Sequence, residues 1–73
     1  MTVQEIAKTV LLAHEVQRVA ADEGDPIDIS SSFIAACEEM HLDRRLGLLL
    51  YYANVWHRDL NQWAQDILEE TGQ

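Results

Sequence analysis

The stretch LDRRLGLLLYYANVWHRDLNQWAQDI, residues 42–67, decides the fold that this sequence predicts. Its apolar residues recur at alternating steps of four and three, which is the spacing of a heptad a/d series on one helix. The eight residues of this heptad stripe are Leu42, Leu46, Leu49, Ala53, Trp56, Leu60, Trp63 and Ile67. We therefore predict a long C-terminal helix over residues 43–70. A break near 57–59 remains open, because Asp59, with Gln62 three residues later, suits the N-cap of a separate fourth helix.

The first half of this predicted helix is apolar on nearly every side. The flanks of the stripe within residues 46–56 carry further apolar residues, namely Leu48, Leu50, Tyr51, Tyr52 and Val55. A helix of this kind needs neighbours all round, and an unbroken helix of about 40 Å is too long for two short helices to cover. We therefore expect a central helix and a homodimer, in which a second copy supplies the missing cover. The alternative is a monomeric three-helix bundle with the first two helices folded over residues 46–56.

Two shorter helices precede the long one. Thr2 and Glu5 form an S/T-x-x-E capping box, which predicts a helix over about residues 3–21. Its apolar residues lie on two offset faces, so this helix needs neighbours on two sides. Pro26 stops the helical pattern and Ser30 suits an N-cap, which predicts a second helix over about residues 30–41. The pattern as a whole predicts an all-α, three-helix bundle, or a four-helix bundle if the last helix breaks, in a single domain over the whole chain.

The composition limits the classes of function. The chain has 73 residues, with 13 acidic and 5 basic side chains and a formal charge of −8. Five scattered basic residues cannot track a phosphate backbone, so we expect no direct nucleic-acid binding. The most apolar run is far shorter than the roughly 20 residues that a membrane-spanning helix needs, and the N-terminus lacks the pattern of a signal peptide. We expect no membrane contact and a cytoplasmic location.

Cysteine usage bears on both stability and chemistry. Cys37 is the only cysteine, so no disulfide forms within the chain, which indicates an intracellular protein. On folding, a domain this small buries only about 60% of the surface that its unfolded chain exposes. Oligomerisation is a usual way to add buried area. Cys37 and His41 stand four residues apart and could share a metal ion on a helix, but zinc needs three or four protein ligands. We expect no metal, no cofactor and no catalytic residue, with a metal or thiol site at Cys37 and His41 as an alternative.

Four of the five aromatic residues lie in the C-terminal segment. Trp56 and Trp63 belong to the heptad stripe, which favours core positions for both. Tyr51 and Tyr52 lie off the stripe, and tyrosine is a preferred anchor of protein interfaces. We expect the partner to bind the first half of the segment, on a surface formed by Leu48, Tyr51, Tyr52, Val55 and Trp56.

The excess of apolar surface and the lack of a catalytic motif predict a non-enzymatic protein that binds other proteins. We expect a small dimeric regulator, adaptor or inhibitor without a small-molecule substrate, of the kind that phages and other mobile elements encode. The alternative is an acidic nucleic-acid mimic that blocks a basic DNA- or RNA-binding groove, for example as an anti-defence inhibitor. This alternative rests on acidic clusters at residues 22–28, at Glu38, Glu39 and Asp43, and at Asp66, Glu69 and Glu70.

Overall fold

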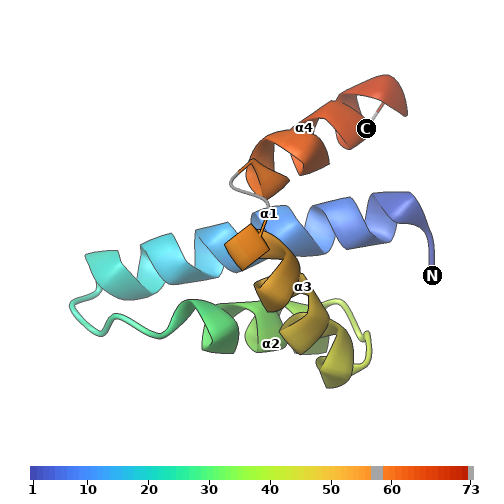
Figure 1. Ribbon diagram of the computed structural model, residues 1–73. Helices are drawn as coiled ribbons and strands as arrows, with labels where there is room; N and C mark the ends of the chain where they lie inside the picture. Colours follow the sequence, from blue (N-terminus) through green and yellow to red (C-terminus); the bar gives the residue numbers. More distant parts are fainter. Residues whose placement is uncertain (57–58, 73) are drawn as a thin grey trace.

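A computed structural model describes residues 1–56 and 59–72. Within these ranges the chain forms the helices α1 (Val3–Asp22), α2 (Ile29–Glu39), α3 (Arg44–Trp56) and α4 (Leu60–Glu70), and it forms no strand (Figure 1). The prediction of an all-α fold is therefore confirmed.

The prediction of one long helix over residues 43–70 is wrong. α3 ends at Trp56 and α4 begins at Leu60, with Asp59 in the N-cap position. The predicted break near 57–59 falls partly on residues 57 and 58, which lie outside the described residues. The physical reason for two helices is that they have different neighbours: α3 packs against α2, whereas α4 packs against α1.

α1 is the central helix of the molecule. It contacts α2 along one side and α4 along another (Figure 1). The cover predicted for both apolar faces is incomplete near the C-terminal end of α1, where Val19 is exposed. α3 lies at the periphery of the single chain. The central position predicted for residues 46–56, which counted on cover from a second copy, stays a prediction. α1 suits the centre because its most deeply buried residues include Ala7 and Ala13, whose small side chains allow other helices to approach closely.

The helix ends follow local sequence signals with one exception. The capping box is confirmed: the Thr2 N–H donates to Glu5 Oε1 and the Glu5 N–H donates to Thr2 Oγ1, both at 3.1 Å. The N-cap predicted at Ser30 is wrong. Asp28 occupies that position without a side-chain capping bond, and Ser30 lies inside α2. Ser32 is the fourth residue of α2 and is buried, and its hydroxyl donates to the Ile29 carbonyl at 2.7 Å.

α1 and α2 end in the same hydrogen-bond pattern, the Schellman motif. The N–H groups of Gly24 and Asp25 donate to carbonyls of the last turn of α1 at 3.1 and 2.9 Å, and those of His41 and Leu42 do the same in α2 at 3.1 and 2.8 Å. The motif requires a left-handed residue after the cap. Gly24 (φ 80°) fills this position in α1, but His41 (φ 59°) fills it in α2.

The core lies where α1, α2, α3 and α4 meet along their inner sides. Phe33 is the largest fully buried side chain, and the same buried cluster contains Ala7, Val10, Ala13, Ala36, Cys37, Leu50, Leu60 and Ala64. Gly47 marks a close approach between α2 and α3. A Cβ at Gly47 would lie 2.9 Å from Ile34 Cα and 3.0 Å from the Phe33 carbonyl oxygen. Glycine therefore allows the backbones of α2 and α3 to touch.

Candidate interaction surface

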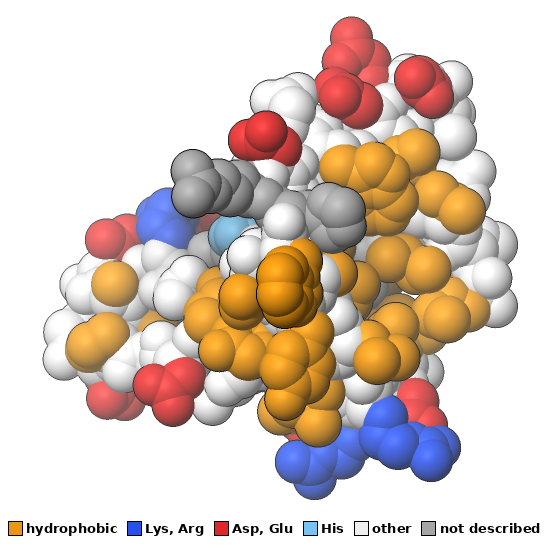
Figure 2. Space-filling view, viewed as in Figure 1, with side chains coloured by type: hydrophobic (Ala, Val, Ile, Leu, Met, Phe, Trp, Pro, Cys, Tyr) orange, Lys and Arg blue, Asp and Glu red, His pale blue; other side chains and the backbone are white. Residues whose placement is uncertain are grey.

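Five large hydrophobic side chains on one side of α3 are exposed. Their exposed fractions are 44% for Leu48, 66% for Leu49, 59% for Tyr52, 57% for Val55 and 81% for Trp56. Steps of three and four residues join them, so they share one helical face. We call these five residues the α3 outer face. It forms a continuous apolar area at the front of the space-filling view (Figure 2).

The opposite side of α3 explains why this face is exposed. Gly47 and Leu50 are buried there, and the close contact of Gly47 with Ile34 holds that side against α2. Because α2 covers only the inner side, and α4 lies against α1, the large side chains on the far side of α3 are left in solvent.

Four of the five residues predicted to bind a partner belong to the α3 outer face: Leu48, Tyr52, Val55 and Trp56. Tyr51 does not. It is half-buried and packs against the core, with its ring tilted towards that of Tyr52 at a centroid distance of 5.5 Å.

The heptad stripe fails as a single core face. It placed Leu49, Trp56 and Trp63 in the core, yet all three are exposed, whereas Leu60 is buried. Leu49 is the one member of the α3 outer face that the predicted surface missed. Its spacing of three residues from Tyr52 and seven from Trp56 was a signal that could have placed it with them.

The N-terminal edge of the α3 outer face is basic. Arg44 and Arg45 open α3, and blue side chains border the apolar area at the lower end of Figure 2. Arg45 pairs with Asp43: its Nη2 lies 2.6 Å from Asp43 Oδ2, and its backbone N–H donates to Asp43 Oδ1 at 2.8 Å. Hydrogen bonds from Arg45 lower the pKa of Asp43 to about 2. In the described part of the chain, Arg44 makes no ion pair.

Acidic side chains gather elsewhere. Asp66, Glu69 and Glu70 line a shallow depression on α4, and red side chains mark this end of the molecule at the top of Figure 2. The α3 outer face itself contains no acidic residue. The acidic group on α4 is therefore separate from the α3 outer face.

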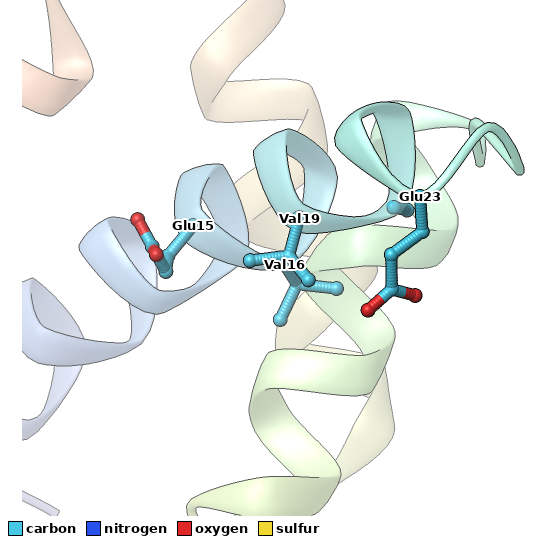
Figure 3. A pocket seen from close by; sticks show the side chains of 5 residues that line it. Glu15, Val16, Val19 and Glu23 are labelled. Atoms are coloured by element: carbon cyan, nitrogen blue, oxygen red, sulfur yellow. The ribbon is translucent and has the colours of Figure 1, made fainter.

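A second hollow lies along α1. Figure 3 shows Val16 and Val19 between Glu15 and Glu23, and Ala20 completes the lining. Four of these five residues belong to α1 and Glu23 is its C-cap, so the hollow has no second wall that could enclose a small molecule. Arg18, on the same helix, pairs with Glu15 and with Asp22.

Cys37 and His41 do not keep the geometry of one helix turn. α2 ends at Glu39, so His41 follows the helix in a left-handed conformation and is exposed. Cys37 is fully buried in the core, and burial raises the pKa of its thiol. Within residues 1–56 and 59–72, no group of three or more His, Cys, Asp or Glu side chains is arranged to hold a metal ion.

His14 is a half-buried histidine on α1. Its ring meets Phe33 edge-on, with centroids 6.0 Å apart and an interplanar angle of 74°. Among the described residues, Nε2 has no hydrogen-bond partner. Burial lowers the pKa of His14 below its usual value, so the neutral ring is the form that suits this site.

Two further findings complete the description of the chain. Over residues 1–56 and 59–72, no helix combines the length and apolar character that crossing a membrane requires. Comparison with protein-family models, with curated proteins and with solved structures finds no match.

Proposed function

We propose that this protein is a non-enzymatic interaction module that acts as a homodimer and regulates, adapts or inhibits another protein. The observation that carries the proposal is the α3 outer face, with five large hydrophobic side chains exposed on one helix. Monomeric proteins seldom expose contiguous apolar patches larger than a few hundred Å². Tyr and Trp, both present here, are typical anchors of protein interfaces.

A second copy of this chain is the occupant that the α3 outer face fits best. At these exposed fractions, two aromatic and three aliphatic side chains present on the order of 600 Å² of surface. That is most of the about 800 Å² per partner that a standard interface buries. Charge does not oppose the pairing, because the carboxylates of the chain lie outside this face. Twofold dimers are also the commonest soluble oligomers.

Molar mass in solution tests this proposal. We expect light scattering to give twice the chain mass of 8.3 kDa, and a Tyr52→Glu variant to give the monomer mass with unchanged helical content. Val3→Glu is the matched control, because Val3 is similarly exposed (51%, against 59% for Tyr52) but lies on α1, and this variant should stay dimeric. A wild-type chain that remains monomeric at about 100 μM, a range in which even modest interfaces with micromolar Kd associate, would sink the proposal.

A second candidate function is the acidic nucleic-acid mimic. The observation that favours it is the group formed by Asp66, Glu69 and Glu70 on α4, which has no ion pair in the described part of the chain. The group lies apart from the α3 outer face, so a dimer formed through α3 leaves it accessible.

Salt dependence and charge removal test the mimic. Its binding to a DNA-binding protein should compete with duplex DNA and weaken steeply as ionic strength rises. A Glu69→Gln, Glu70→Gln variant should lose this binding. The matched control is Glu38→Gln, Glu39→Gln, which removes the same charge from exposed positions of α2. Binding that ignores salt, or that survives in the Glu69→Gln, Glu70→Gln variant, would exclude a role for the α4 group. Equal loss in both variants would overturn the α4 group as the specific site.

A further inference from the structure

We infer that the two copies pair through antiparallel α3 helices, with the twofold axis passing beside Tyr52. The inference rests on the proposed function, because it takes the second copy as the occupant of the α3 outer face. Tyr52 lies at the middle of that face, which runs from Leu48 to Trp56. An antiparallel pairing about Tyr52 sets Leu48 of one copy against Trp56 of the other, and Leu49 against Val55.

The sizes of the side chains favour this direction. The face begins with two leucines, Leu48 and Leu49, and it ends with Trp56, its largest and most exposed member. In an antiparallel pair each tryptophan meets a leucine end, so the distance between the helices stays even along their length. In a parallel pair the two Trp56 side chains meet and hold the leucine ends apart. Interface cores are packed as closely as protein interiors, which favours the even arrangement.

The charges at the ends of α3 favour the same direction. A parallel pair brings Arg44 and Arg45 of both copies to one end, where Asp43 offsets only one guanidinium in each copy. An antiparallel pair instead places the Arg44 and Arg45 side chains of the two copies at opposite ends of the paired helices. Like charges facing each other across an interface are unfavourable. Side-chain size and charge are independent features of α3, and both select the antiparallel pair.

A spin-label distance distinguishes the two directions. A nitroxide attached to Arg45→Cys lies at a well-exposed position beside the face, seven residues from Tyr52. With a rise of 1.5 Å per residue and helix axes 8–10 Å apart, the antiparallel pair separates the two labelled backbones by roughly 23 Å, and the parallel pair by about 10 Å. Wild-type chain treated with the same reagent is the control for Cys37, which is fully buried.

Disulfide trapping gives a second readout. In the antiparallel pair, a mixture of Leu49→Cys and Val55→Cys chains should form a mixed disulfide dimer, whereas each variant alone should not cross-link. In the parallel pair, each residue faces the same residue of the other copy. Each variant alone should then cross-link, and the mixed disulfide should not form.

The outcomes separate this inference from the proposed function. A dimer with a distance near 23 Å and the mixed cross-link supports both. A dimer with a distance near 10 Å and self-cross-linking variants overturns the antiparallel direction and leaves the α3 outer face as the contact. A dimer with a distance beyond about 35 Å, longer than α3 pairing in either direction allows, shows contact through another surface and overturns the inference. A monomeric mass overturns the proposed function itself.

Discussion

The two sides of α3 differ in residue size and in cover. On the inner side, Gly47 has no side chain, and the helix approaches the backbone of Ile34 closely. On the outer side, five large hydrophobic side chains have no comparable neighbour and remain exposed. One helix therefore carries two separate functions: its inner side holds the fold together, and its outer side is available for association. Substitutions on the two sides should change different measured quantities.

Trp56→Ala should have the largest effect, and that effect should appear in association. Trp56 is the most exposed large hydrophobic residue of the chain, so its removal leaves no cavity in the monomer. In a twofold dimer both copies lose the side chain, and we expect a loss of about 3 kcal/mol in dimerisation free energy, which is more than 100-fold in Kd. Analytical ultracentrifugation measures Kd, and circular dichroism should show the same helical content. A variant that dimerises as well as the wild type would contradict the role of the outer side.

Gly47→Ala should have the next largest effect, and it should appear in the stability of the monomer. The new Cβ would meet backbone atoms of Phe33 and Ile34 at about 3 Å, and backbone cannot move aside as a flexible side chain can. Alanine gains about 1 kcal/mol in helix propensity, yet overpacking costs about 1–3 kcal/mol or more. We expect a net loss of about 2 kcal/mol in unfolding free energy, measured by urea denaturation at concentrations that keep the chain monomeric. Leu49→Ala, on the outer side, is the control and should lose little. Unchanged or higher stability of Gly47→Ala would mean that α2 and α3 are not in backbone contact.

His41→Gly tests the turn that leads into the inner side of α3. His41 holds a left-handed conformation that costs most residues about 1–2 kcal/mol, and glycine adopts it freely at the cost of a more flexible unfolded chain. The variant should gain about 0.5–1 kcal/mol in unfolding free energy. Gly24 occupies the same position after α1, so Gly24→Ala should lose a similar amount. If α1 and α2 share this motif, the change in unfolding free energy must be positive for His41→Gly and negative for Gly24→Ala.

The smallest expected effect is the pH dependence of stability that His14 causes, beneath the covered side of α3. His14 contacts Phe33, whose carbonyl oxygen faces Gly47. Burial holds the pKa of His14 below 6.5 in the folded state. The unfolded chain therefore takes up the proton first as pH falls, so the stability that the neutral ring provides is complete above about pH 6.5 and declines below it.

Comparison with a His14→Gln variant isolates this contribution. Glutamine cannot titrate, so the difference in unfolding free energy between wild type and variant should shrink from about pH 7.5 to about pH 5.5, on either side of the usual pKa of histidine. The dimerisation constants of the two proteins should change with pH in parallel, since His14 lies on α1 away from the outer side. If the difference in unfolding free energy grew as pH falls, the pKa of His14 would be raised in the folded state, which contradicts the effect of burial.

Local signals in the sequence predicted local structure well. Thr2 and Glu5 mark the start of α1, and the spacing of Ala7, Val10 and Ala13 marks its buried face. The heptad stripe was misleading because its regular spacing continues from Trp56 to Leu60, although α3 ends at Trp56 and α4 begins at Leu60. Periodicity reports which residues share a face within a helix, but it does not report where the chain changes direction.

The candidate surface was predictable only in part, for a related reason. Residues 46–56 are apolar on both sides, so spacing alone cannot decide which side is covered. The close approach of Gly47 to Ile34 decides it, and that contact joins helices whose relative placement the sequence pattern did not reveal. Tyr51 and Leu49 were consequently assigned to the wrong sides, the former to the partner surface and the latter to the core.

The arrangement of α3 against a single helix also has a consequence for local opening. α1 is enclosed by two helices, whereas α3 rests mainly on α2, so α3 can detach without disturbing the contact between α1 and α4. Segments with few buried contacts open at lower free energy than the core and exchange their amide hydrogens sooner. The amides of α3 should thus exchange faster than those of α1 in dilute protein. They should slow as protein concentration rises, because association protects only the closed form.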